Sequence, residues 1–305
     1  MKYRVAGTTA SGDLSRPLER ARLKQIEAAQ AFCITTWEVE EKLSLLLDNF
    51  YEFEVELLML AQELVIWRNH EYIDTMQRRL RLDRRLVNLL TACRLYLDQT
   101  DHVISSVFGS ESKERERIKL FKSKQYDMHW GYRLMEALRN HAQHAGLIVH
   151  VIAHHYEHSR DQNGHVTATE FTVIPHTTVQ TLAQNPEFKK SVLEELKKKG
   201  KDIDLRRPIR QYVACLMSIH SEIRDLLKAR TAEARIAYEA ALIEFGKHEG
   251  NVVYFPTLQE LDDAGNTVTR VQLVSEFLEA LDSLSKKNSG FDSLPLHFAS
   301  NRAPE

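Results

Sequence analysis

The segment "KLSLLLDNFYEFEVELLMLAQELVIW", residues 42–67, carries apolar side chains at intervals of three and four positions. Such intervals place the side chains on one face of an α-helix, because a turn takes about 3.6 residues. The stripe consists of Leu43, Leu46, Leu47, Phe50, Phe53, Leu57, Leu60, Leu64 and Trp67. The pattern predicts a helix from about Thr36 to Asn69, which is long enough to be one member of a bundle of long helices.

The segment over about 71–108 continues this pattern with two apolar stripes side by side, and Gly109 is expected to end it. A helix with two stripes is packed on two sides, as inside a bundle. Because the 305 residues include only 11 glycines and 7 prolines, long helices with few turns are expected throughout. Further helices are predicted over about 14–34, 110–124, 127–145, 178–199, 201–250 and 272–286.

Two regions change to an alternating pattern that is rich in β-branched residues, which is typical of strands. The first covers about 147–174, with a turn at "RDQNG", and the second covers about 252–271, with a turn at "DDAGN". We therefore expect a mainly α fold, an elongated helical bundle with two small β-hairpin additions. Residues 1–13 are expected to form a flexible tail, 14–286 a single helical domain, and 287–305 a disordered tail.

Composition excludes several classes of protein. Hydrophobic residues make up 43% and charged residues 28% of the chain, and the net charge is −2, so nothing draws the whole chain to nucleic acid or to an anionic membrane. The three cysteines, Cys33, Cys93 and Cys215, are widely spaced and form no CxxC pair, which indicates neither a disulfide framework nor a thiolate zinc site. The first residues lack the apolar core of a signal peptide, and no apolar run has membrane-spanning length. A cytoplasmic location without a membrane partner is expected.

The segment "EALRNHAQHAG", residues 136–146, gathers an arginine, an asparagine and two histidines within a predicted helix. Asn140 and His144 are four positions apart, so they share a face. Arg139 is five positions before His144, about 140° round the helix axis, so the two side chains cannot easily grip one small group. Two copies of the helix related by a twofold axis would bring them together. The geometry therefore suggests a site that is shared in a homodimer.

These residue types suit RNA cleavage without a metal or cofactor. A histidine can move a proton near neutral pH, an arginine binds phosphate with its fork, and an asparagine can orient a neighbour or donate to an oxyanion. In such a reaction the 2′-hydroxyl loses its proton and attacks the adjacent phosphorus, leaving a 2′,3′-cyclic phosphate and a 5′-hydroxyl. We expect His144 to act as the acid/base, Arg139 to stabilise the transition state, and Asn140 to orient it.

The sequence "RNHAQH", residues 139–144, resembles the R-x4-6-H motif of HEPN-domain proteins, including the polar residue that follows the arginine in many members. The resemblance implies an α-helical, HEPN-like domain that is often dimeric, and a metal-independent endoribonuclease that acts as a toxin or an anti-phage defence effector. It also implies Arg139, Asn140 and His144 as the catalytic set. His141 falls at a variable position and takes no role from it. By analogy with the family, transfer RNA is one candidate substrate and an antitoxin protein one candidate partner.

Two other groups are candidate RNA contacts. Arg78, Arg81 and Arg85 share a helix face and can form a phosphate-binding strip, although the pattern favours a solvated outer face. In the first strand of the earlier hairpin, His150, His154 and His158 alternate onto one face; this face can line an RNA groove or simply meet water. Neighbours four apart on a strand are about 13 Å apart, too far to share one metal.

Three functional hypotheses remain open. The first is the endoribonuclease. The second is a catalytically inactive helical protein that dimerises, serves as an adaptor or binds RNA. The third, a metal hydrolase that uses the histidine-rich strand, has the least support from the spacing.

Overall fold

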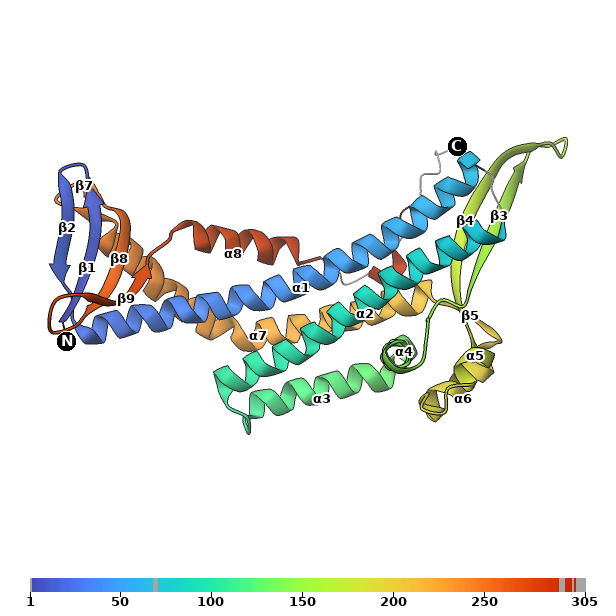
Figure 1. Cartoon of the computed structure of the whole chain (residues 1–305), viewed down its shortest axis with the longest axis horizontal. Coiled ribbons are helices and arrows are strands. Elements are labelled where there is room, and N and C mark those ends of the chain that lie inside the picture. The colour runs from blue at the N-terminus through green and yellow to red at the C-terminus, as the bar shows by residue number, and fades with distance from the viewer. Residues whose placement is uncertain (1, 68–70, 291–293, 298, 300–305) are drawn as a thin grey trace. The chain divides into compact units, whose positions relative to one another are not determined.

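The computed structural model describes residues 2–67, 71–290, 294–297 and 299, and it is mainly helical with small antiparallel sheets (Figure 1). The chain divides into two compact units. Unit 1 comprises Met1–Glu41 and Ile223–Ser289, and unit 2 comprises Lys42–Glu222 and Gly290–Glu305. The sequence predicts one domain over 14–286. The division falls inside the two long helices α1 (Arg20–Trp67) and α7 (Arg206–Phe245), so no linker composition marks it.

Unit 1 contains a four-stranded antiparallel sheet in the order β2-β1-β8-β9. Its strands are β1 (Lys2–Thr9), β2 (Gly12–Pro17), β8 (Tyr254–Leu261) and β9 (Thr267–Gln272). The predicted flexible tail over 1–13 is therefore wrong, because β1 pairs with β2 on one side and with β8 on the other. The later hairpin is confirmed, but it is half of this larger sheet rather than a separate addition.

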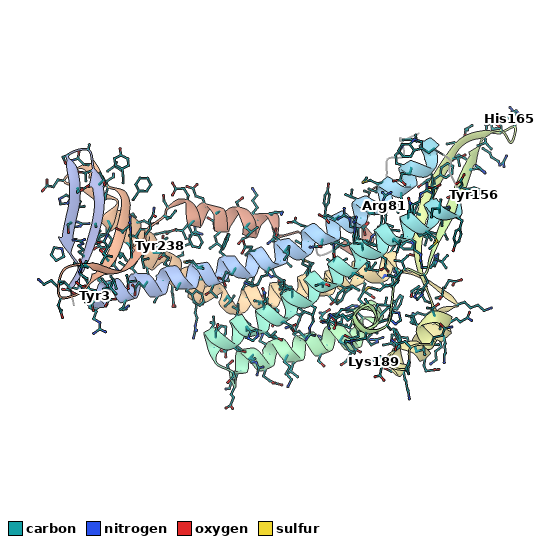
Figure 2. All side chains as sticks on the ribbon, in the orientation of Figure 1. Tyr3, Arg81, Tyr156, His165, Lys189 and Tyr238 are labelled. Atoms are coloured by element: carbon teal, nitrogen blue, oxygen red, sulfur yellow. The ribbon has the colours of Figure 1, made fainter. Side chains whose placement is uncertain are left out.

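The core of unit 1 lies between the sheet, the first part of α1, the last part of α7, and α8 (Glu276–Lys287). It includes Val5, Leu23, Ile26, Cys33, Tyr238, Phe245, Leu258 and Leu278. Tyr238, labelled in Figure 2, donates to the carbonyl oxygen of Val274 at 3.2 Å, so its hydroxyl has a partner inside this core. Two short strands, β6 (Lys247–His248) and β7 (Asn251–Val252), pair near the end of α7.

A buried polar cluster joins three helices or their ends in unit 1. The Glu40 carboxylate accepts from Arg224 Nε at 2.6 Å and from Asn288 Nδ2 at 3.0 Å. Lys287 ends α8 and Asn288 directly after it is buried, so the segment 287–305, predicted as a disordered tail, begins with ordered residues. Leu294–Leu296 forms a short 3-10 turn, and residues 291–293, 298 and 300–305 lie outside the described residues.

Unit 2 is built from the second part of α1, the first part of α7, and the helices between them. These are α2 (Tyr72–Phe108), α3 (Lys113–Met128), α4 (Trp130–His144), α5 (Val179–Ala183) and α6 (Lys190–Lys199). Most of the apolar side chains in the predicted stripes are buried, including Leu43, Leu46, Phe53, Leu60, Leu64, Leu82, Leu86 and Leu89. Trp67 in the first stripe and Ile73 and Leu80 in the second are exposed instead. Gly109 ends α2 with a positive φ of 97°, which confirms the predicted stop.

The earlier hairpin is confirmed as β3 (Val151–Arg160) and β4 (Val166–Thr178), and β5 (Asp202–Asp204) adds a third strand to it. The helix predicted over 178–199 is divided into α5 and α6. Pro186 lies between them, where its missing N–H and its ring oppose a continuous helix. The helix predicted from 201 begins only at Arg206, because residues 202–204 pair with β4.

Candidate functional site

Helix α4 carries the motif residues and packs tightly against α7. A Cβ atom on Gly131 would lie 2.6 Å from Gln211 Oε1 and 2.8 Å from the carbonyl oxygen of Pro208, so only glycine permits this approach. The Gly131 amide donates to Gln211 Oε1 at 2.9 Å. Leu134, Leu138 and His141 follow at helical spacing on the buried face of α4. The start of the helix is thereby fixed against the core.

One face of α4 lines a cleft of about 940 Å³ in unit 2. The cleft lies between α2, α3, α4 and the 184–189 segment that joins α5 to α6, elements that Figure 1 shows close together. Its polar and aromatic lining comes from Arg94, Asp98, Asp101, Lys122, Ser123, Tyr126, Tyr132, Glu136, Asn140, His141, His144, Asn185, Glu187, Phe188 and Lys189. The volume is that of a site for a small molecule or for part of a polymer.

Asn140 and His144 both line this cleft and both are exposed, in agreement with their predicted common face. Arg139 does not line it. The guanidinium of Arg139 donates from Nη1 to Asn140 Oδ1 at 3.2 Å, and its buried Nε has no hydrogen-bond partner in the part of the chain that the structure describes. A single chain thus brings together two of the three predicted catalytic residues and leaves the arginine beside them.

Three cations line the cleft, and two of them are neutralised there. Arg94 Nε donates to Asp98 Oδ2 at 2.8 Å, and Lys122 Nζ donates to Asp101 Oδ1 at 2.6 Å. Lys189 differs, because within the described residues it forms no ion pair. Its ammonium donates to the Tyr126 hydroxyl and lies 4.7 Å from the centroid of that ring. Lys189, labelled in Figure 2, is therefore the cleft cation most available to an anionic ligand.

Tyr132 lines the cleft and packs against a second buried phenol, Tyr212, which does not line it. The Tyr212 hydroxyl donates to Glu136 Oε1 at 2.5 Å, and the rings of Tyr132 and Tyr212 meet edge to face with centroids 5.0 Å apart. Burial raises the pKa of both phenols well above the ordinary value. These hydroxyls stay protonated at neutral pH, so they are hydrogen-bond donors rather than proton acceptors.

His141 is a site residue that the motif does not identify. Its side chain is buried, and its Nδ1 lies 3.0 Å from Asn185 Nδ2, which donates to it. The His141 ring also meets Phe188 edge to face at a centroid distance of 6.1 Å. Burial lowers the pKa of His141, which favours the neutral ring that this hydrogen bond needs. The only sequence signal was its position on the apolar side of α4.

His150, a predicted RNA contact, is engaged within the protein. Its Nδ1 accepts from the Thr178 amide at 2.9 Å, so its Nε2 carries the proton that it donates to the carbonyl oxygen of Leu147, also at 2.9 Å. Burial lowers the pKa of His150 as well. His154 is half-buried on β3 opposite Val173 and, like His150, does not line the cleft.

The predicted arginine strip faces α1. Arg78 pairs with Glu63 at 3.3 Å, and Arg81 pairs with both Glu56 and Glu63 at 2.7 Å. Arg85 pairs with Glu52 and lies 3.6 Å from Glu56. Arg81 is labelled in Figure 2, on α2. The strip is a row of ion pairs between two helices, so its guanidinium groups already have carboxylate partners and we do not place them in the site.

The far half of the β3–β4 hairpin is exposed, and Figure 2 shows Tyr156 part-way along it and His165 at its tip. Tyr156 contacts His158 and Phe171 on one face, at centroid distances of 5.6 and 6.4 Å. No group of His, Cys, Asp or Glu suited to holding a metal occurs among the described residues. The hairpin is thus an aromatic and imidazole surface apart from the cleft.

Comparison with family models, with curated proteins and with solved structures finds no match for this chain. No helix within the described residues combines the length and hydropathy needed to cross a membrane.

Proposed function

We propose that this chain is a metal-independent endoribonuclease of the HEPN type, with the helices of unit 2 as a HEPN-like bundle. The observation that carries the proposal is that Asn140 and His144 line one cleft together with Lys189 of the 184–189 segment. An imidazole, an amide and an unneutralised ammonium at one opening suit a phosphodiester substrate. The proposed location is the cytoplasm, where RNA is the substrate.

In the proposed reaction, His144 takes the proton of a ribose 2′-hydroxyl, whose oxygen then attacks the adjacent phosphorus. The bond from phosphorus to the 5′-oxygen breaks, and that oxygen takes a proton from water as it leaves, while His144 returns its proton to the solvent. The products are a 2′,3′-cyclic phosphate and a 5′-hydroxyl. Asn140 orients the transition state through its amide, and Lys189 binds a neighbouring phosphate.

Arg139 enters this proposal from a second copy of the chain. In its own subunit it is displaced from the cleft, and its Nε has no partner among the described residues. A twofold axis near the end of α4 would place the Arg139 of each subunit beside the His144 of the other. The guanidinium would then stabilise the charge that develops on the phosphorane.

A toxin or defence role, with transfer RNA as a substrate and an antitoxin as a regulator, is the biological context that this activity suggests. A second candidate function is RNA binding or dimerisation without cleavage. One observation favours it: Glu136 and Glu187, which have no cation partner among the described residues of the cleft, also line it and oppose the approach of a polyanion.

The experiment that separates the two functions is an analysis of RNA ends. The pure protein is incubated with RNA in EDTA, and the fragments are tested for 2′,3′-cyclic phosphate and 5′-hydroxyl groups. His144→Ala should lower the cleavage rate by about 10²–10⁴-fold. His155→Ala, which removes an exposed histidine outside the cleft, is the control and should cleave like the wild type. RNA that is bound but stays intact would favour the second function.

A further inference from the structure

The segment that follows α4 has no regular structure of its own, yet part of it is buried. Residues 145–150 lie between the end of α4 and the start of β3, and Ile148 and Val149 within it are fully buried. Buried backbone amides need acceptors, since each unpaired one carries a large desolvation penalty. The amides of these two residues therefore require a partner from another element.

Asp83 supplies that partner. It lies in α2, is only 3% exposed, and its Oδ1 accepts from Ile148 N at 2.7 Å and from Val149 N at 2.8 Å. Hydrogen bonds to an ionised acceptor are stronger than those between neutral groups. No salt bridge to Asp83 occurs among the described residues, so these two amides are the main compensation for its buried charge.

The two hydrogen bonds act close to the candidate catalytic histidine. His144 is the last residue of α4, four positions before Ile148. On the other side, the His150 ring donates to Leu147 O within the same segment. The carboxylate and the imidazole together fix residues 147–150, and hence fix where the last turn of α4 ends.

We propose that Asp83 is a positioning residue that holds the His144 imidazole in the cleft through the amides of Ile148 and Val149. As far as it concerns catalysis, this proposal rests on the proposed nuclease function. Without the carboxylate, two buried amides lose their acceptor and residues 145–149 move toward water. The last turn of α4 then loses its fixed end, and His144 samples positions outside the cleft.

The test uses Asp83→Ala and Asp83→Asn in the full chain. The asparagine variant keeps one carbonyl oxygen for the amides but loses the charge, so it retains the fold if the alanine variant does not. Leu46→Ala, which removes a fully buried side chain of α1, is the control for a general loss of stability. Because a misplaced catalytic group can cost up to about 10²-fold in rate, kcat should fall by up to about 10²-fold in Asp83→Ala while KM stays near the wild-type value. The kcat of Asp83→Asn should lie between the values of the wild type and of Asp83→Ala.

A second measurement does not depend on nuclease activity. The imidazole resonances of His144 are recorded by NMR in protein labelled at histidine and assigned by their loss in His144→Ala. In both Asp83 variants the His144 signals should shift and broaden, whereas in Leu46→Ala they should stay unchanged. If the wild type cleaves no RNA, the proposed function fails while this measurement still decides the positioning role. His144 signals like those of the wild type in folded Asp83 variants, or an equal loss of kcat in Leu46→Ala, would overturn it.

Discussion

Asn185 Nδ2 donates to His141 Nδ1 at 3.0 Å and so ties the 184–189 segment to helix α4. Both residues line the cleft, so the contact joins two of the elements that form it. Lys189 lies at the end of the same segment as Asn185 and also lines the cleft. Asn185 Oδ1 also accepts from the Glu187 amide at 3.0 Å, which shapes the segment itself. One amide side chain thus controls the position of the cation that is most available to a ligand.

Asn185→Ala should destabilise the protein by about 1–3 kcal/mol, since it leaves the buried Nδ1 of His141 without its donor. Urea unfolding followed by circular dichroism measures the change. Hydrogen exchange should also become faster at Glu187–Lys189. Asn163→Ala, in the exposed turn between β3 and β4, is the matched control and should change the unfolding free energy by less than about 0.5 kcal/mol. Equal stability of the two variants would show that the hydrogen bond contributes nothing.

The pH dependence of stability should reflect His141 and His150. Burial lowers the pKa of both in the folded state, so below about pH 6.5 the unfolded chain binds more protons than the folded chain. Their contribution is complete above the unfolded pKa and is lost as the pH falls through and below it. Unfolding free energies measured between pH 7.5 and 5 should therefore decrease with acid.

Replacement of His150 by glutamine tests the source of that slope. The variant His150→Gln removes one titrating ring, so its stability should depend less steeply on pH than that of the wild type, even if it is lower at every pH. His155→Gln changes an exposed ring on β3 and should keep the wild-type slope. The explanation fails if both variants show the same pH dependence as the wild type.

Arg81→Ala should reduce stability without specifically reducing RNA affinity. Arg81 pairs with Glu56 and Glu63, and its removal leaves the buried Glu56 with a weaker partner, at a cost of about 1–3 kcal/mol. Arg84→Ala, an exposed neighbour on α2, should cost less than about 0.5 kcal/mol in urea unfolding. A stable Arg81→Ala with weaker, less salt-dependent RNA binding would instead restore the phosphate-strip hypothesis.

The periodic parts of the fold are predictable from the sequence, because the spacing of their apolar side chains is enough to show which face is buried. Leu43 and Leu82 mark helices in this way, and the alternation after residue 147 marks β3 and β4. Strand β1 is not predictable by the same means. Val5 is its one fully buried apolar residue, and its partner Leu258 in β8 is far away along the chain.

The site residues show the same contrast between local patterns, which the sequence reveals, and distant contacts, which it does not. Helical spacing places Asn140 and His144 on one face, and the cleft contains both. Asp83 and Asn185 were missed because their partners are 65 and 44 positions away, respectively, and a single aspartate or asparagine has no local pattern. The contacts that hold a site in place are tertiary, so they follow from the packing of α2, α4 and the 184–189 segment rather than from any motif.

Lys189→Ala should weaken RNA binding in a salt-dependent way. If Lys189 contacts one phosphate, its loss should lower the slope of log K against log salt concentration by about 0.7 for single-stranded RNA. Fluorescence anisotropy at several salt concentrations measures that slope. Lys190→Ala, the exposed neighbour that does not line the cleft, should keep the wild-type slope. Identical slopes in the two variants would place the phosphate elsewhere.

The displacement of Arg139 from the cleft of its own subunit makes a prediction about mixed dimers. Arg139→Ala and His144→Ala should each be inactive as homodimers, because every site lacks one of the two groups. When both are co-expressed, half of the dimers are heterodimers, and in each of these one site receives an intact arginine and an intact histidine from different subunits. The mixture should therefore recover about a quarter of the wild-type cleavage rate.

The control for this recovery is a mixture of His144→Ala with the double variant Asn140→Ala/His144→Ala. No chain in this mixture carries His144, so it should stay inactive. If Arg139 and His144 act within one subunit, the first mixture stays inactive too, since each chain lacks one of the groups. Recovery of activity therefore depends on the two side chains meeting across a subunit interface. We propose this arrangement from the 140° separation on the helix, from the Nε of Arg139, which has no partner among the described residues, and from the exposed face of Asn140 and His144.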